Sequence, residues 1–209
     1  MALSTDLHRI FDFIIELDKL KAVLRKTKPV ELDRYENSAE HSWQVALLAI
    51  LLAKEAVPAI DVTRVVEMLL VHDIPEIDTD DRIVYQGRDE QARLAEYAAA
   101  ERIFGLLPEA QAKWCQDLWA EYDARLTNEA KFAYAIDRLM PLLHNLRNHG
   151  QSWVENHVPL DRIFQVNAAI GHSLPSVWPY VQSLIHEFAT TTSLISTHSR
   201  TGITSSQQV

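Results

Sequence analysis

Four residues combine the side-chain types and the order that a metal centre requires: His41, His72, Asp73 and Asp137. His41 and Asp137 lie in apolar stretches, and the His72-Asp73 pair directly follows an apolar run over 65–71. An unpaired carboxylate in a low-dielectric interior costs several kcal/mol, so these acids need a cation or solvent. Imidazole and carboxylate groups bind divalent Mn, Fe, Co, Ni and Zn. One divalent transition metal would therefore account for the whole set.

Each of these residues, taken alone, also has an ordinary structural explanation. A histidine on an apolar helix is more often a satisfied core residue, and Asp73 could accept hydrogen bonds from a helix N-terminus. Asp137 could pair with Arg138 or with another arginine. The ordered set is more specific, because His72 follows His41 by 31 positions and Asp137 follows Asp73 by 64. That order, spread over successive helices, favours a metal centre.

The segments that carry these residues are predicted to be helices. Asn37, with Glu40 three residues later, has the capping-box pattern for a helix over about 38–56. That helix is apolar nearly all round, so we expect it at the centre of a bundle with Trp43 in the core. Asp61 should cap the next helix, which ends near His72-Asp73, and 75–87 is predicted as an acidic loop.

The rest of the chain has the same helical pattern. Helices are predicted over about 7–24, 89–104, 108–122, 127–148, 160–170 and 175–189. The chain has only 5 glycines and no strand-like alternation of useful length. The fold class is therefore predicted to be all-α, a single-domain helical bundle over residues 1–189. The last segment, 190–209, contains eleven Ser or Thr and little apolar content, so we expect a disordered tail.

Composition excludes several classes of function. The net charge is -9 with no block of Lys or Arg, so a nucleic-acid backbone or an anionic membrane is not an expected partner. A single cysteine, Cys115, excludes an internal disulfide framework and fits a reducing compartment. We see no signal-peptide pattern at the start and no apolar run of the ~20 residues needed to span a membrane. These features predict a cytoplasmic protein.

Three segments carry a resemblance to a known family. Together they resemble the HD-domain phosphohydrolase superfamily, and within it the small 5′-deoxynucleotidase-type HD proteins, over about 11–179. The segments are Ala39-Glu40-His41-Ser42, Leu70-Val71-His72-Asp73-Ile74-Pro75-Glu76-Ile77 and Ala135-Ile136-Asp137-Arg138-Leu139. The resemblance implies an HD-type helical bundle, often a homodimer, that acts on nucleoside 5′-monophosphates. It also implies that His41, His72, Asp73 and Asp137 coordinate one divalent transition metal, whether Mn, Co, Ni, Zn or Fe.

The histidine distribution favours one metal over two. Two-metal members of the superfamily use extra histidine ligands between the His-Asp pair and the final aspartate. No histidine lies between Asp73 and Asp137 in this chain. The pattern therefore argues against the dinuclear, oxygenase-like branch.

A hydrolytic site also needs a proton carrier and a cation for the phosphate. A bound metal lowers the pKa of its water from 15.7 toward roughly 7, which gives hydroxide at neutral pH. Glu76, three residues after Asp73, is the best candidate for handling the proton. Asp81 is second, because the family carries another acid on the same loop. Asp78 and Asp80 are expected to be solvated.

The family places a basic residue between its first helix and the first motif histidine. Arg25 and Arg34 are our preferred candidates here, because a guanidinium can hold phosphate through two hydrogen bonds. Lys26 and Lys28 lie in the same region, and a basic surface helix end is a common alternative explanation. Arg138 is expected to orient a neighbouring carboxylate rather than to touch substrate.

These observations predict a metal-dependent phosphohydrolase. The leading hypothesis is a 5′-nucleotidase that releases phosphate from (deoxy)nucleoside 5′-monophosphates. Two alternatives remain: an HD phosphohydrolase of another phosphorylated metabolite, and a metal-bound, non-catalytic nucleotide-binding protein. The expected partners are a small phosphorylated substrate and a second copy of the chain.

Overall fold

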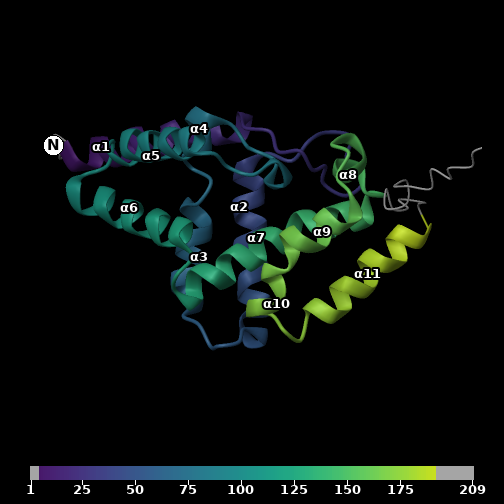
Figure 1. Ribbon diagram of the computed structural model, residues 1–209. Helices are drawn as coiled ribbons and strands as arrows, with labels where there is room; N and C mark the ends of the chain where they lie inside the picture. Colours follow the sequence, from purple (N-terminus) through teal and green to yellow (C-terminus); the bar gives the residue numbers. More distant parts are fainter. Residues whose placement is uncertain (1–4, 192–209) are drawn as a thin grey trace, which may run out of the picture.

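The computed structural model describes residues 5–191, in which helices are joined by connecting segments (Figure 1). Its α-helices are α1 (Thr5–Glu16), α2 (Ser38–Leu52), α3 (Val62–Val71), α4 (Glu76–Thr79), α5 (Glu90–Phe104), α6 (Glu109–Ala124), α7 (Asn128–Arg147), α8 (Gln151–Glu155), α9 (Leu160–Asn167), α10 (Ala169–Ser173) and α11 (Trp178–Thr191). Short 3-10 turns are η1 (Leu17–Ala22), η2 (Ala53–Glu55) and η3 (Val84–Gln86). Residues 5–191 contain no strand, only an isolated bridge between Leu24 and Asn37. The all-α prediction is confirmed.

Three helices, α2, α3 and α7, pack against one another and hold the centre of the molecule. Figure 1 shows α7 crossing α2, with α6 beside α3, and α10 packs against α7. Val45, Met68, Phe132 and Ile136 from these helices have no exposed surface. Burial of such side chains stabilises the fold by about 1.5–3 kcal/mol each. The packed trio is the rigid support for every residue discussed below.

Helix starts follow the capping chemistry that the sequence predicts. The Asn37 side chain accepts a hydrogen bond from the Glu40 backbone, and the Glu40 carboxylate accepts one from the Asn37 backbone at 2.8 Å. Asp61, Asp89 and Thr127 cap α3, α5 and α7 through their side chains. These caps satisfy backbone N–H groups that no helical carbonyl can reach.

Helix ends differ more from the predictions. The first helix stops at Glu16 rather than near 24, because the chain then turns through η1 and pairs with a distant segment. The Arg25 backbone donates to the Glu36 carbonyl at 2.8 Å, and the Glu36 backbone donates to the Thr27 carbonyl at 2.9 Å. The predicted acidic loop contains α4 and η3, and α8 was not expected at all. Non-local pairing of this kind leaves no periodic signal in the sequence.

One expectation is wrong: α2 is not buried on all sides. Trp43 is 63% exposed, and Leu47, Ile50 and Leu51 are 43%, 54% and 69% exposed. These four residues lie on one face of the helix. The opposite face is buried against α3 and α7, which cover only that side. Trp43 is therefore a surface residue rather than a core residue.

The C-terminal boundary lies beyond the expected one. Thr190 and Thr191, expected to begin the tail, complete α11. Residues 192–209 lie outside the described residues, so the disordered tail stays a prediction. Among the described helices, none has the length and apolar content to cross a membrane.

The first testable prediction concerns Cys115, which is 3% exposed on α6. Burial raises the pKa of its thiol to about 11, so the thiol stays protonated and unreactive at pH 8. We expect an aromatic disulfide reagent to label it slowly at pH 8 in the native protein and fully in denaturant. Stoichiometric labelling of the native protein within seconds would contradict this placement.

Candidate metal centre

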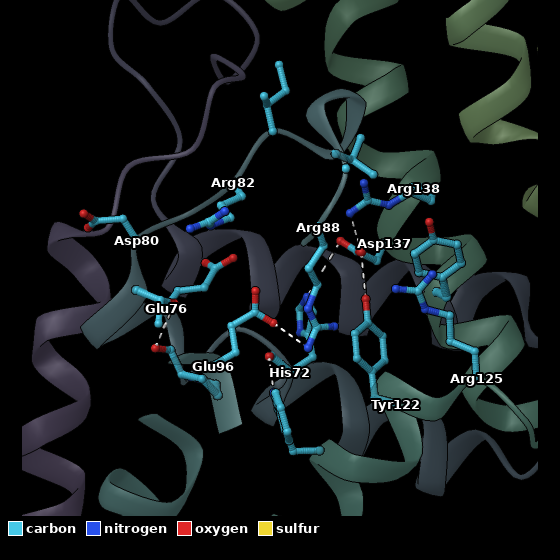
Figure 2. A pocket seen from close by; sticks show the side chains of 17 residues that line it. His72, Glu76, Asp80, Arg82, Arg88, Glu96, Tyr122, Arg125, Asp137 and Arg138 are labelled. Atoms are coloured by element: carbon cyan, nitrogen blue, oxygen red, sulfur yellow. Dashed lines mark hydrogen bonds and ion pairs between the residues drawn. The ribbon is translucent and has the colours of Figure 1, made fainter. Parts of the chain in front are cut away.

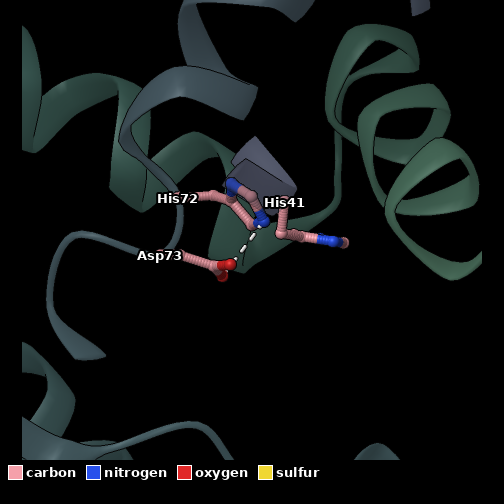
Figure 3. Close-up of side chains that lie close together, drawn as sticks. All are labelled: His41, His72 and Asp73. Atoms are coloured by element: carbon pink, nitrogen blue, oxygen red, sulfur yellow. Dashed lines mark ion pairs between the residues drawn. The ribbon is translucent and has the colours of Figure 1, made fainter. Parts of the chain in front are cut away.

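The fold brings the four predicted ligands together from three helices. His41 lies in the first turn of α2, His72 and Asp73 follow the end of α3, and Asp137 lies in the middle of α7. All four side chains are buried. Ligand atoms of His41, His72 and Asp73 lie within 4.8 Å of one another (Figure 3). The sequence shows only the order of these four residues along the chain, whereas the fold brings them into one compact cluster.

Asp137 completes the cluster with one carboxylate oxygen. Its Oδ1 lies 2.9 Å from His41 Nε2 and 3.7 Å from His72 Nε2. Its Oδ2 accepts hydrogen bonds from the Tyr122 hydroxyl at 2.8 Å and from Arg138 at 2.6 Å. Burial alone would raise the pKa of Asp137, but Arg138 and the two histidines hold it well below its ordinary value. The carboxylate is therefore ionised, with one oxygen fixed and the other facing the histidines.

The geometry of His72 leaves a lone pair for a cation. Its Nδ1 lies 2.8 Å from the Leu69 carbonyl oxygen, which can only accept, so Nδ1 carries the proton in the neutral ring. Its Nε2 lies 3.0 Å from Asp73 Oδ1 but has no hydrogen-bond partner, although it is buried. A buried nitrogen acceptor beside two carboxylates is a position that a divalent cation satisfies. The donor set of two imidazoles and two carboxylates thus fits a transition metal.

Glu36, which the sequence did not indicate, stands behind His41. Its Oε2 lies 3.3 Å from His41 Nδ1, on the far side of the ring from Asp137. Glu36 is 1% exposed, and Thr27 donates to the same oxygen at 3.2 Å. Burial would raise the pKa of Glu36, but His41 and Arg25 lower it below its ordinary value. A carboxylate at this place orients the histidine and keeps Nε2 available.

The structure separates the two arginines proposed for phosphate binding. Arg25 is 7% exposed and donates to Asp73 Oδ2 at 2.7 Å, with its guanidinium 3.8 Å from Asp137. Arg34 is not brought to the cluster; its guanidinium forms a bidentate ion pair with Glu40 at the surface. Arg25 therefore lies beside the cluster, whereas Arg34 lies at the surface.

The two proposed catalytic acids lie beside the cluster. Glu76, at the start of α4, accepts a hydrogen bond from the Ser38 hydroxyl at 2.6 Å. Burial and the charge of Asp73 raise the pKa of Glu76 well above its ordinary value. Asp81 lies 3.7 Å from Arg25, and burial raises its pKa despite that cation. Both carboxyls therefore hold a proton more readily than ordinary acids, and Glu76, whose pKa is raised further, is the better candidate for a proton carrier. In contrast, Asp78 pairs with Arg102 away from the site.

A pocket of about 310 Å³ opens next to the cluster (Figure 2). His72, Glu76 and Asp137 form part of its wall, so the metal ligands and the proposed acid face the same space. The volume is at the lower end of the range for small-molecule sites. The arrangement can hold a phosphate ester against the ligands with Glu76 within the same cavity.

The HD-domain family profile matches residues 17–178, which is most of the chain. The chain belongs to the HD-domain phosphohydrolase superfamily. The match spans all four predicted ligands and the acidic loop.

Curated relatives agree with this placement over part of their length. The 5′-deoxynucleotidase HDDC2 of Xenopus laevis is 28% identical over 117 residues, which are 56% of this chain and 57% of that protein. The human 5′-deoxynucleotidase HDDC2 is 28% identical over 113 residues, 54% of each chain. The matched region is thus a little over half the length of these relatives.

Solved structures match over nearly the whole chain. A predicted metal-dependent phosphohydrolase from Magnetospirillum magnetotacticum is 38% identical with a TM-score of 0.85, over 92% of this chain and 99% of that one. An HD-domain phosphohydrolase from Listeria innocua has a TM-score of 0.57 at 17% identity, over 87% of this chain and 86% of that one. The second likeness shows the fold alone.

The position of Glu36 behind His41 predicts that replacing Glu36 weakens metal binding. We expect Glu36→Ala to weaken Co²⁺ or Mn²⁺ binding by about 10–100-fold, because His41 loses the group that orients it. Glu36→Gln keeps an acceptor oxygen and should lose less. Calorimetric titration of the metal-free protein measures both, with Glu101→Ala, an exposed glutamate on α5, as control. Equal affinities for the wild type and Glu36→Ala would refute the orienting role.

Proposed function

We propose that the protein is a metal-dependent phosphomonoesterase that releases phosphate from (deoxy)nucleoside 5′-monophosphates. The observation that carries the proposal is a buried His-His-Asp-Asp cluster that shares a cavity with Glu76 and contacts Arg25. The nucleotide substrate is supported by the curated relatives, which are named 5′-deoxynucleotidases. These relatives match over only part of their length at 28% identity, so they support the reaction class more directly than the nucleotide substrate.

The residues proposed to hold the metal are His41, His72, Asp73 and Asp137. One divalent transition metal, Mn, Co, Ni, Zn or Fe, fits this donor set. When bound, such a metal supplies hydroxide from water near neutral pH and neutralises charge on the phosphoryl group. The remaining chemistry falls to side chains of the chain itself.

Glu76 is proposed to protonate the leaving 5′-oxygen. Its raised pKa keeps a proton on the carboxyl at a pH where an ordinary glutamate has lost it. The hydrogen bond from Ser38 fixes one carboxyl oxygen, which leaves the other to face the pocket. Asp81 is proposed as a second acid that tunes the charge around Arg25.

Arg25 is proposed to bind the phosphate oxygens. Carboxylates surround it, and they hold its pKa well above the ordinary value despite burial, so it is always charged. Its Nη1 and Nη2 atoms point at Asp73 and Asp137, the same groups proposed to hold the metal. A phosphate at the ligands would therefore meet a guanidinium without any large rearrangement.

Phosphate release tests this proposal. The metal-free protein, reloaded with Mn²⁺, Co²⁺, Ni²⁺, Zn²⁺ or Fe²⁺, should hydrolyse at least one nucleoside 5′-monophosphate. Glu76→Gln should keep the metal and lose about 100-fold or more in kcat, because proton transfer contributes 10²–10⁴-fold. Asp137→Ala should lose the metal itself, and Glu101→Gln should match the wild type.

Other outcomes would favour the alternatives. Release from a sugar phosphate but not from any nucleotide would indicate a different phosphorylated metabolite. Nucleotide binding without release under any metal would indicate a non-catalytic protein. Full turnover by Glu76→Gln would refute the acid role of Glu76.

We also propose that the chain forms a homodimer through the exposed face of α2. Trp43, Leu47, Ile50 and Leu51 form an apolar surface that a second copy would cover. Sedimentation should give twice the 23.9 kDa chain mass for the wild type and the single mass for Leu51→Glu. Leu94→Glu, at an exposed leucine on α5, should stay dimeric. A monomeric wild type would refute the proposal.

The cytoplasmic location stays a prediction.

A further inference from the structure

The pocket beside the cluster has more arginines than one phosphate requires. Four of its lining residues are arginines: Arg82, Arg88, Arg125 and Arg138. Figure 2 shows them around the cavity above the cluster, with Arg82 on the side of Glu76 and Arg125 on the side of Tyr122. Arg25, the group proposed for the reacting phosphate, does not line this pocket. These arginines are therefore additional to Arg25.

Two of the four arginines are committed to carboxylates. Arg88 pairs with Asp123 and, at 2.9 Å, with Glu96. Arg138 pairs with Asp137. In contrast, neither the Arg82 nor the Arg125 side chain has a hydrogen bond or an ion pair within residues 5–191. Ion pairing within this part of the chain therefore does not explain why Arg82 and Arg125 line the pocket.

Arg125 is nevertheless held in place. It ends α6 in a left-handed conformation, with φ 53°, and its guanidinium stacks on the Tyr134 ring at 4.0 Å from the centroid. Arg138 lies over the same ring at 5.3 Å. The Nε atom of Arg138 is buried without a hydrogen-bond partner. Stacking of this kind orients a guanidinium while leaving its N–H groups free for a ligand.

Three of these arginines act electrostatically on the same acid in the pocket. Glu96 lines the cavity, and burial raises the pKa of its carboxyl. Arg88, Arg82 and Arg125 all oppose that rise, so all three act on the same small volume. Asp123 pairs with Arg88 and raises the pKa of Glu96, so Arg82 and Arg125 are the two of these cations whose side chains have no carboxylate partner among the described residues. The pocket lining contains four arginines and four acids, and Glu96 and Asp137 among these acids pair with Arg88 and Arg138.

We infer that the substrate carries a second phosphoryl group, and that Arg82 and Arg125 bind it while the first is hydrolysed. The inference rests on the proposed function, because it assumes that a 5′-phosphate is hydrolysed at the cluster. Guanidinium groups bind phosphate through charge-assisted, often bidentate hydrogen bonds. A nucleoside with phosphates at the 5′ and 3′ positions, or a 5′-diphosphate, has the required chemistry. A nucleoside 5′-monophosphate has nothing anionic to offer these two side chains.

The reaction on a 3′,5′-bisphosphate is ordinary ester hydrolysis. Water attacks the 5′-phosphorus, the bond between phosphorus and O5′ breaks, and O5′ takes a proton. The 3′-phosphate stays on the product nucleoside. No oxidant, reductant or further reactant is needed.

Matched nucleotides test the inference. Release of phosphate from deoxyadenosine 5′-monophosphate and 3′,5′-bisphosphate, and of pyrophosphate from the 5′-diphosphate, would be compared for the Mn²⁺- or Co²⁺-loaded protein. Cleavage between the 5′-phosphorus and O5′ leaves the two phosphoryl groups of the diphosphate joined. We expect kcat/KM for one of the doubly phosphorylated nucleotides to exceed that for the monophosphate by about tenfold or more, the value of one charge-assisted contact. Whichever nucleotide gains identifies the position of the second phosphate.

Variants assign the gain to the arginines. Arg82→Gln and Arg125→Asn should each remove most of the preference, so that the ratio of the two kcat/KM values falls toward one. Asparagine is chosen at 125 because it tolerates the left-handed backbone there, which protects folding. Arg147→Gln, an exposed arginine on α7 outside the pocket, should keep the wild-type ratio.

The results separate this inference from the proposed function. Equal kcat/KM for all three nucleotides would overturn the second phosphate site and leave the nucleotidase intact. Equal loss on mono- and bisphosphate in Arg82→Gln and Arg125→Asn would assign both arginines to the reacting phosphate and overturn the inference as well. No release from any nucleotide would refute the proposed function, and this inference would fall with it.

Discussion

Five buried or partly buried acids converge on one cation, and this concentration of charge organises the molecule. Arg25 lies within 4 Å of carboxylate oxygens of Asp73, Asp81, Asp137 and Glu36, and Glu76 acts on it electrostatically. Acids packed this closely repel one another in a low-dielectric interior. Arg25 and Arg138 offset part of that repulsion, and His41 and His72 also contact the carboxylates. A divalent cation at the same place would complete the balance.

That constraint explains why distant segments must meet. Arg25 lies after η1, Glu36 lies just before α2, Asp73 lies after α3, and Asp137 lies on α7. The backbone pairing of 23–27 with 36–38 places Arg25 and Glu36 side by side before any side chain is considered. The packing of α2, α3 and α7 then places the ligands from three helices around them. The core and the charged cluster therefore depend on the same three helices.

The cluster is held from behind by groups that do not belong to the ligand set. The Leu69 carbonyl fixes the proton on His72, Tyr122 and Arg138 hold one oxygen of Asp137, and Glu36 faces His41. Each of these contacts costs little to form, because the partners come from packed helices that are already ordered. In contrast, the arginine side of the pocket comes from the 82–88 segment and the end of α6. The proposed second phosphate site therefore takes Arg82 and Arg125 from connecting segments, whereas His41 and Asp137 lie on helices of the core.

The sequence by itself determined the fold class, the helix starts and the identity of the four proposed ligands. Capping residues such as Asn37 and Asp61 act within one turn, and a carboxylate in an apolar helix is anomalous wherever the helix packs, so both are local signals. Only the tertiary structure placed Arg25, and not Arg34, beside the cluster. It also left one face of α2 exposed and placed Glu36 and Tyr122 against the ligands. Those outcomes depend on which surfaces meet after the chain folds back on itself. No periodicity encodes that meeting, because packing and charge compensation between elements fix these contacts, whereas periodicity reports only the environment of each element.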